Sequence, residues 1–311
     1  MKRQDHRGGV RIKESTKKIF RLHGWRVDRA IHNYLYFIFY ALYVKSALYL
    51  TKAVVALFSR LEATKYIPKF VFERYHSKVL SHGDATKILN LNETVLLGTD
   101  TSIIPYKYAN KIMLREPDNL AVMDCPCKLE LKDPCRPVAS CIAVGRPIVD
   151  FWMEHCQKYH VHRITRGEAL EIIDAHRRTG HINQAFFKVA TGGSMGVICS
   201  CCPKCCVSIR ATRLAQKIKG AQDVSMFAPS GYTVRHDADR CELCGTCVKT
   251  CNFDAIEIKD GVRVYHSEAC IGCELCVENC ERRALTLVLE EGGLLPLDMD
   301  MVLDKLDEYI E

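Results

Sequence analysis

The most apolar part of the chain is the stretch Ile31–Phe58, close to the N-terminus. Eleven consecutive residues within it, Tyr34–Val44, carry no charge, and the lysines that follow, Lys45 and Lys52, lie two helical turns apart. Both lysines therefore fall on one face of a helix. This pattern predicts an apolar, helical N-terminal segment, which we assign to residues 31–100.

Three roles for this helix are open from the sequence. A helix lying in the membrane surface fits the lysine spacing and the five tyrosines of the stretch, with the basic residues 1–30 on anionic lipid. A spanning helix has enough length, but two central lysines make it costly. A buried or partner-facing helix of a soluble protein is the third role.

Short apolar strands and helices alternate between residues 101 and 235. Leu120–Met123 and Gly196–Ile198 read as buried strands, and each leads directly into cysteines. Apolar side chains at three- and four-residue steps predict helices over Tyr106–Leu114 and Pro147–Tyr159. A capping box at Thr165 predicts the start of another helix. We therefore expect an α/β middle domain with its cysteines at the ends of strands, where ligand sites gather in open sheets.

The last part of the chain has the pattern of short paired strands. Residues 255–258 and 262–265 flank an Asp-Gly turn, which predicts a hairpin. Tyr232–Arg235 and Leu285–Leu289 form a second strand pair, and the tail Leu294–Ile310 has helical spacing. The predicted fold class is α+β: an apolar helical segment, the α/β middle domain, and a C-terminal domain over residues 236–311 that ends in a helix.

Two copies of one cysteine pattern, C-x2-C-x2-C-x3-C, lie within this C-terminal domain. The first copy is Cys241, Cys244, Cys247 and Cys251, and the second is Cys270, Cys273, Cys276 and Cys280. This spacing holds [4Fe–4S] clusters in bacterial ferredoxins, whereas zinc sites usually use two C-x2-4-C pairs. Residues 232–292 resemble the two-cluster ferredoxin family, although Asn252 and Glu281 stand where the family usually has proline.

The resemblance implies two [4Fe–4S] clusters with crossed ligands, because the fourth cysteine of each run reaches the other cluster. Cluster I would take Cys241, Cys244, Cys247 and Cys280. Cluster II would take Cys270, Cys273, Cys276 and Cys251.

Nine further cysteines gather in the middle domain: Cys125, Cys127, Cys135, Cys141, Cys199, Cys201, Cys202, Cys205 and Cys206. Such a density of thiols indicates a soft-metal site, with one or two further iron–sulfur clusters favoured over zinc or a redox-active dithiol. One partition gives each of the two loops its own cluster, and this is the partition we expect. In the other, the loops meet and hold one larger or unusual site.

The middle region also resembles cysteine-rich iron–sulfur proteins of anaerobic bacteria that carry a C-terminal ferredoxin pair. The residues that carry this likeness are 124–127, 198–202 and 228–232. The resemblance implies no particular activity for the middle domain.

Charge divides the chain into three zones. The net charge of +7 hides a basic arm at residues 1–30, with ten Lys and Arg against three Asp and Glu, and an acidic region at 241–311, with six against sixteen. Thiolate ligands need a reducing compartment, and no secretory signal is evident. We expect a cytoplasmic protein, attached in one interpretation to the inner face of the membrane, with no nucleic-acid partner.

The chain shows no nucleophile with its base, no paired carboxylates and no nucleotide-binding motif, so we assign no catalytic residues. The predicted function is electron transfer through several [4Fe–4S] clusters, beside a flavoprotein or membrane redox complex. Two alternatives are kept. One is thiol/disulfide or iron–sulfur oxidoreductase chemistry at residues 199–206, and the other is a zinc-stabilised scaffold that carries a ferredoxin domain.

Overall fold

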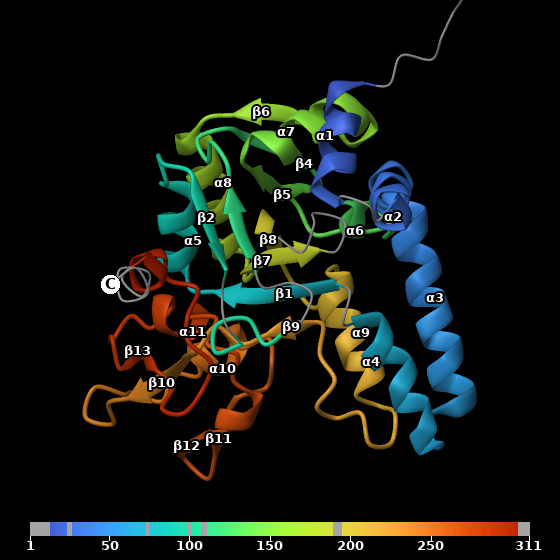
Figure 1. Cartoon of the computed structure of the whole chain (residues 1–311). Coiled ribbons are helices and arrows are strands. Elements are labelled where there is room, and N and C mark those ends of the chain that lie inside the picture. The colour runs from blue at the N-terminus through green and yellow to red at the C-terminus, as the bar shows by residue number, and fades with distance from the viewer. Residues whose placement is uncertain are drawn as a thin grey trace, which may run out of the picture.

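A seven-stranded sheet forms the centre of the computed structural model, which describes residues 13–23, 27–72, 75–98, 101–106, 111–188 and 195–303 (Figure 1). In spatial order its strands are β6 (His162–Ile164), β4 (Leu120–Asp124), β5 (Ala139–Val144), β8 (Met195–Cys201), β7 (Ile182–Lys188), β1 (Tyr75–Leu80) and β9 (Phe227–Ala228). Neighbouring strands are antiparallel except for β1 and β9. The middle domain thus has helices and strands in alternation, as expected, but its strands pair mainly in the antiparallel sense.

The sheet also takes in a strand from the segment that we assigned to the N-terminal region. β1 lies between β7 and β9, so residues 75–80 belong to the same core as the middle domain. The apolar helical segment thus ends before β1.

Helices cover both faces of the sheet. One face carries α1 (Glu14–His23), α2 (Val27–Ile38), α3 (Tyr40–Phe58), α6 (Pro126–Leu129), α7 (Arg146–His155) and α9 (Val207–Ala215), with η1 (Glu62–Lys65), α4 (Tyr66–Phe72) and η2 (Gln157–Tyr159) near them. The other carries α5 (His82–Leu89) and α8 (Arg166–Arg178). Alternate strand residues enter two separate cores: Cys141 and Cys199 face one, and Ile142 and Ile198 the other.

The second core is closed by a hairpin, β2 (Val95–Gly98) with β3 (Lys111–Leu114). We expected a helix over residues 106–114, and this prediction is wrong. Ile112 and Leu114 are fully buried at a spacing of two, which suits a strand, and only the three-residue steps of the sequence suggested a helix. Residues 107–110 lie outside the described residues.

Other local predictions are confirmed. β4 and β8 cover the two predicted strands, and α7 with η2 covers residues 146–159. The capping box of α8 is present, with the Thr165 hydroxyl accepting from the Glu168 amide. Part of the basic arm, which we expected to be exposed, is helical and packed: α1 packs on α7, and the Thr16 hydroxyl bonds the His155 ring.

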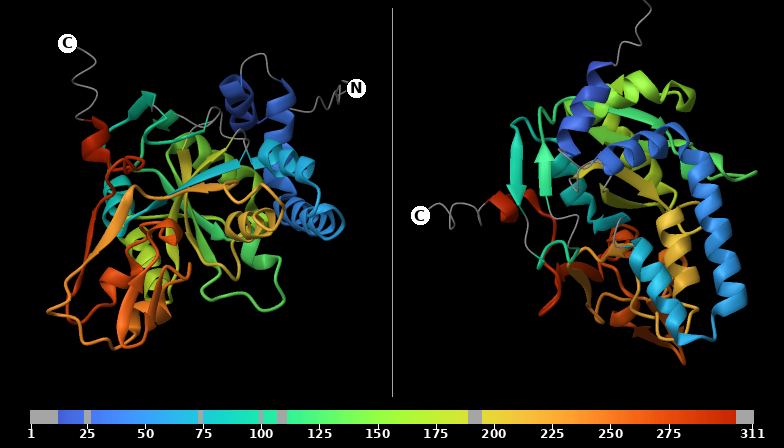
Figure 2. Two further views of the ribbon diagram at one scale, coloured as in Figure 1. Left: turned by 90° about the horizontal axis from the view of Figure 1, so that it is seen from below. Right: turned by 45° about the vertical axis from the view of Figure 1, so that its right-hand side comes forward.

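The C-terminal domain is built from two strand pairs and short helices, which lie below the sheet in Figure 1 and to one side of it in both views of Figure 2. Its elements are β10 (Tyr232–His236), α10 (Thr246–Thr250), β11 (Ile256–Lys259), β12 (Val262–Tyr265), η4 (Ser267–Ala269), α11 (Leu275–Glu278) and β13 (Leu285–Leu289). β10 pairs with β13 and β11 with β12, which confirms both predicted strand pairs. After β13 the chain returns to the sheet, where Leu297, Met299 and Val302 enter the second core.

Candidate iron–sulfur centres

The eight cysteines of the C-terminal domain line two separate cavities. The outer cavity, of about 180 Å³, is lined by Cys241, Cys244, Cys247 and Cys280. The inner cavity, of about 20 Å³, is lined by Cys251, Cys270, Cys273 and Cys276. Each cavity thus takes three cysteines from one run and the fourth from the other, which is the crossed arrangement that the ferredoxin resemblance implies.

The two cysteine loops repeat one backbone conformation. The second run follows the first at an offset of 29 residues, since 270 − 241 = 29. Positive φ angles recur at this offset: Leu243 with Gly272, Gly245 with Glu274, and Asp254 with Arg283. Because side chains rarely adopt positive φ, three such pairs show that both loops turn in the same way. Each loop is therefore shaped around its cavity in the same manner.

Backbone amides point at cysteine sulfurs in these loops. The N–H of Ala255 donates to Sγ of Cys251 and that of Gly272 to Sγ of Cys270, both at 3.4 Å. Ala284 donates to Cys280 at 3.3 Å. Such bonds stabilise thiolates that bind a cluster. The cysteines and their amides therefore fit a pair of [4Fe–4S] clusters, each held by four thiolates.

The inner cavity lies against the sheet domain. Arg177 of α8, only 4% exposed, donates from Nε to both carboxylate oxygens of Glu278 at 2.8 and 2.9 Å. Its Nη2 donates to the carbonyl of Cys273 at 2.9 Å. Burial raises the pKa of the Cys273 thiol to about 12, and the nearby Arg177 guanidinium acts in the opposite direction. One buried arginine thus fixes the inner loop to the sheet domain.

Further contacts reinforce this docking. The Asn252 side chain donates to the carbonyl of Gly180 at 2.8 Å, and the His82 amide donates to Glu274 at 2.8 Å. Asn252 stands where the ferredoxin family usually has proline, and here its amide contributes to the interface.

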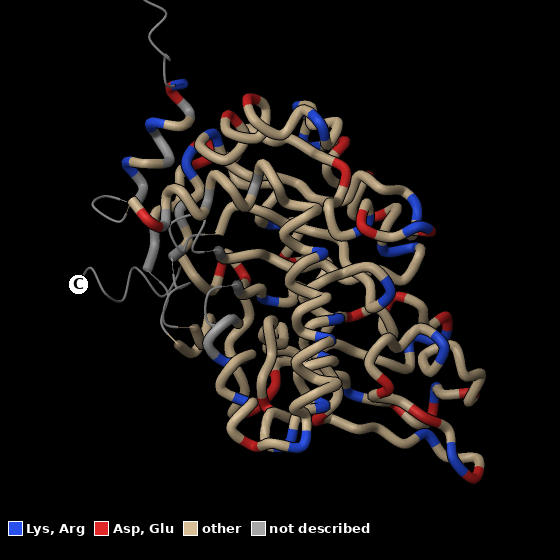
Figure 3. Tube along the Cα trace, turned by 90° about the vertical axis from the view of Figure 1, so that its right-hand side faces the viewer, with Lys and Arg blue, Asp and Glu red and all other residues tan. Residues whose placement is uncertain are grey.

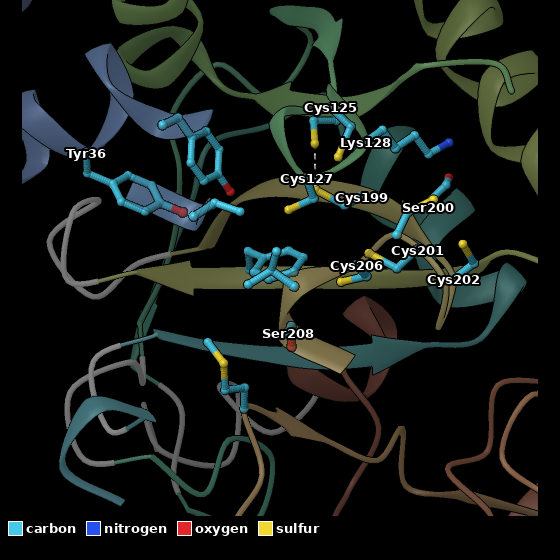
Figure 4. Close-up of a pocket in the computed structure, with 17 residues that line it drawn as sticks. Tyr36, Cys125, Cys127, Lys128, Cys199, Ser200, Cys201, Cys202, Cys206 and Ser208 are labelled. Carbon is cyan, nitrogen blue, oxygen red and sulfur yellow. Dashed lines mark hydrogen bonds between the residues drawn. The ribbon is translucent and has the colours of Figure 1, made fainter. Parts of the chain in front are cut away.

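In the middle domain, eight of the nine cysteines line one cavity of about 60 Å³ (Figure 4). They are Cys125, Cys127, Cys141, Cys199, Cys201, Cys202, Cys205 and Cys206. Sheet topology brings them together. β4 and β8 both flank β5 and are antiparallel to it, so both end at the edge where β5 begins. The cysteines that follow β4, start β5 and end β8 therefore meet at one edge.

Six of these cysteines follow one another around the cavity, and we call them the six-cysteine ring. In order around it the residues are Cys127, Cys125, Cys141, Cys199, Cys201 and Cys206, and Cys206 lies near Cys127. Sγ of Cys141 and Sγ of Cys199 are 3.2 Å apart. Hydrogen bonds with the neighbouring sulfurs, together with burial, raise the pKa of the Cys141 and Cys201 thiols well above the usual range. A soft cation or cluster at the ring would offset this cost of forming thiolates.

The remaining three cysteines form a second group, Cys135, Cys202 and Cys205. Both groups draw on both loops, so the positions of the sulfurs favour a shared arrangement over the partition that we expected, with one cluster for each loop. The two loops share their cysteines because β5 pairs with β8 in the antiparallel sense, which places Cys141 directly opposite Cys199. Cys156 lies buried elsewhere in the first core, and burial raises its pKa to about 12.

Residues that sequence reasoning did not assign to a site complete the walls of the ring cavity. Tyr36 and Tyr40, from α2 and the start of α3, and Val44 close one side. Lys128 lines another side, is 1% exposed, and donates from Nζ to the carbonyl of Pro137 at 2.7 Å. A buried cation is costly unless negative charge lies near it, so Lys128 favours an anionic thiolate centre here. In the sequence, only the position of Lys128 directly after Cys127 indicated that it lies at the cysteine site.

Comparison with known proteins supports the C-terminal assignment. Residues 240–285 match the family model of the 4Fe-4S dicluster domain. A stretch of 64 residues, 20% of the chain, is 36% identical to the archaeal-type glutamate synthase [NADPH] of Dehalococcoides mccartyi (strain ATCC BAA-2266 / KCTC 15142 / 195). The match spans 13% of the length of that relative. The C-terminal part of this chain is thus a ferredoxin-like 4Fe–4S domain, and its role is iron–sulfur electron transfer.

Proposed function

We propose that this protein relays electrons along a chain of centres, from the outer cavity through the inner cavity to the six-cysteine ring. Two [4Fe–4S] clusters would be held by the crossed cysteine sets, and a further iron–sulfur centre by the ring. A bound [4Fe–4S] cluster supplies reversible one-electron transfer. The partner at the outer cavity would be a flavoprotein or a membrane redox complex, since Cys244 is exposed there.

The observation that carries this proposal is the continuity of the core between the inner cavity and the ring. Phe253 lines the inner cavity, and its ring centroid is 6.1 Å from that of Phe227. Met226, the residue before Phe227, lines the cavity of the six-cysteine ring. Cys273 also packs against the same hydrophobic core as Cys125 and the rest of the ring. A few side chains in direct contact therefore separate the two sites, which favours electron exchange between them.

The test is iron and sulfide analysis with EPR on protein purified without oxygen. Two cubanes alone account for about eight iron atoms per chain, so the proposal expects more than this. Cys273→Ser should remove the signal of the inner cluster, whereas Cys156→Ser, at a buried cysteine outside both groups, should change nothing. Eight iron atoms or fewer, with unchanged iron in a Cys199→Ser variant, would exclude an iron–sulfur centre at the ring.

Thiol/disulfide chemistry is the alternative for the ring, and the 3.2 Å contact of Cys141 with Cys199 favours it. Two thiols at this distance need little movement to form a disulfide. Mass spectrometry of alkylated peptides after mild oxidation distinguishes the two. A reversible Cys141–Cys199 disulfide in protein without iron at the ring would favour oxidoreductase chemistry over a relay.

We also propose that α3 attaches the protein to an anionic membrane surface. α3 is long and apolar enough to cross a membrane by length and composition alone. Its Tyr40, Val44 and Leu48 are buried against the body, however, and a spanning helix would have to give up this packing. The opposite side exposes Leu42, Tyr49, Leu50 and Leu57 to solvent. Figure 3 views the molecule from this side, where most of the helical trace is uncharged.

Charge supports a lipid surface as the occupant of this face. Lys45 and Lys52 are exposed, and on a helix they lie between the buried stripe and the apolar one. Long lysine side chains at such a flank reach lipid headgroups while the apolar side chains enter the bilayer boundary. The basic residues 1–30 add net charge of the same sign.

Co-sedimentation with vesicles tests this attachment. The protein should bind vesicles that contain phosphatidylserine, and Leu50→Glu with Leu57→Glu should weaken binding at least about tenfold, since burying two carboxylates is costly. Val262→Glu, at an equally exposed valine on the ferredoxin hairpin, is the matched control. Unchanged binding of the double variant would refute the proposal and leave a protein partner for this face.

A further inference from the structure

Three cysteine sulfurs lie together beside the six-cysteine ring. The Sγ atoms of Cys135, Cys202 and Cys205 all lie within 4.8 Å of one another, and those of Cys135 and Cys202 are 3.6 Å apart. Cys202 and Cys205 are 7% and 1% exposed, and Cys135 is half-buried. The group therefore has one side toward solvent and two ligands in the protein interior.

The sulfur spacing fits one metal ion better than a cluster. A zinc–sulfur bond of about 2.3 Å sets the edge of a tetrahedron of sulfurs at about 3.8 Å. The sulfurs of Cys135 and Cys202 are close to this separation at 3.6 Å, and that of Cys205 lies within 4.8 Å of both. In a cubane each cysteine binds a different iron, so its ligand sulfurs are spread around the cluster and lie farther apart. The geometry thus separates this group from the crossed sets of the C-terminal domain.

The local chain has the form of a zinc-binding loop. Cys202 and Cys205 form a C-x2-C pair, the spacing usual for zinc ligands. The amides of Cys205 and Cys206 donate to the carbonyl of Cys202 at 3.2 and 2.9 Å, which makes a tight turn. The amide of Cys135 donates to Sγ of Cys205 at 3.4 Å, as amides around metal-bound thiolates do.

The loops that supply these cysteines are also joined at the surface. Nζ of Lys204 lies 2.9 Å from Oδ2 of Asp133. Both side chains are exposed, so this ion pair adds little stability. It does link the loop that holds Cys135 to the loop that holds the C-x2-C pair, and so helps to keep the three sulfurs together.

We propose that Cys135, Cys202 and Cys205 bind a single Zn²⁺ ion whose fourth position is open to water or to a small ligand. Among the residues that the structure describes, no fourth histidine, cysteine or carboxylate ligand atom joins this group. Three protein ligands with an open position are the arrangement of catalytic zinc sites, in which the ion activates a bound water or polarises a substrate. Cys202 and Cys205 border the ring cavity, but this site uses none of the cysteines of the ring or of the C-terminal domain as ligands, so its metal can be tested apart from the electron relay.

Metal analysis of the full chain, purified without oxygen, tests the proposal. Wild-type protein should hold about one zinc per chain, and Cys202→Ser should lower zinc at least about fivefold while iron and sulfide stay constant. Cys156→Ser is the control at a buried cysteine outside the group. Loss of iron and sulfide in Cys202→Ser would instead assign these sulfurs to a cluster and overturn the proposal. So would wild-type protein without zinc.

X-ray absorption at the zinc edge needs no variant, and so avoids the case in which Cys202→Ser fails to fold. The expected shell is three sulfurs at about 2.3 Å and one oxygen or nitrogen at about 2.0 Å. A shell of four sulfurs would overturn the open position. Failure of the electron relay would show in the iron signals and not in this zinc shell, so the two proposals can fail separately.

Discussion

Gly272, in the inner cysteine loop, offers the sharpest test of how the ferredoxin-like domain is fixed to the rest of the molecule. A Cβ added at Gly272 would lie 2.1 Å from Oγ of Ser230 and 2.2 Å from the carbonyl oxygen of Tyr232. Gly245, in the outer loop, has a similarly positive φ, but an added Cβ there meets nothing closer than Ile258 at 3.9 Å. Gly245→Ala is thus a matched control for the backbone strain alone.

The magnitudes follow from these distances. Forcing alanine into a left-handed conformation costs about 1–2 kcal/mol, and both variants carry this cost. In Gly272→Ala the chain must also move away from residues 230–232. That movement breaks two hydrogen bonds, from the Ser230 amide to the Ile271 carbonyl and from the Ser230 hydroxyl to the Gly272 carbonyl. Each lost hydrogen bond costs about 1 kcal/mol, and lost van der Waals contacts add to this. We therefore expect Gly272→Ala to lower the free energy of unfolding by at least about 2–3 kcal/mol more than Gly245→Ala does.

The assay is denaturant unfolding without oxygen, followed by the absorbance of the clusters and by hydrogen exchange of residues 228–236. Gly272→Ala should unfold at a lower denaturant concentration and lose protection in this segment. Gly245→Ala should lose stability without losing that protection. Equal midpoints for the two alanine variants would refute the reasoning, because they would show that the close approach to residues 230–232 does not contribute.

Three further variants test the charged groups of the core. Arg177→Met should destabilise the protein by about 2 kcal/mol, because it removes the hydrogen bonds of the buried guanidinium to Glu278 and to the Cys273 carbonyl, and proteolysis should then cut more readily between the domains. Lys128→Met should lower the reduction potential of a centre at the ring by on the order of 60 mV, the one-electron equivalent of about 1.4 kcal/mol, as a potentiometric EPR titration would show. Burial lowers the pKa of Lys78 from 10.5 to about 7. Between about pH 7 and pH 10.5 the Lys78 side chain is therefore neutral in the folded protein and protonated in the unfolded chain. The unfolding free energy of the wild type should therefore rise from pH 7 to pH 10 by about 1 kcal/mol per pH unit relative to Lys78→Met, and parallel curves would contradict the buried position of its charge.

Local structure could be predicted where short-range chemistry decides it. The Asp260-Gly261 turn fixes the β11–β12 hairpin, and the Thr165 hydroxyl fixes the start of α8. The two cysteine runs share a backbone because their spacing imposes the same loop twice. In each case the decisive residues lie within a few positions of one another, and the sequence displays them directly.

The grouping of the middle cysteines could not be predicted, because it depends on which strands are neighbours. Nothing in the sequence says that β5 lies between β4 and β8, and this order alone places Cys141 beside Cys199. The same limit explains the wrong helix over residues 106–114. Residues 111–114 form a strand because they pair with β2, and the spacing of apolar residues within 106–114 does not reveal a partner outside that range.

The position of α3 links two features that the sequence presents as unrelated, the apolar segment and the cysteine-rich loops. Tyr40 and Val44 close the six-cysteine ring, while Leu50 and Leu57, farther along the same helix, face solvent. Tyr40 and Val44 are 6% and 4% exposed, so the wall that this helix gives the ring is dry, and burial raises the pKa of the Tyr40 hydroxyl well above its usual range. A dry wall lowers the local dielectric, and the potential of an iron–sulfur centre depends on its exposure to solvent. Any partner or surface that moves α3 would therefore change the environment of the ring as well.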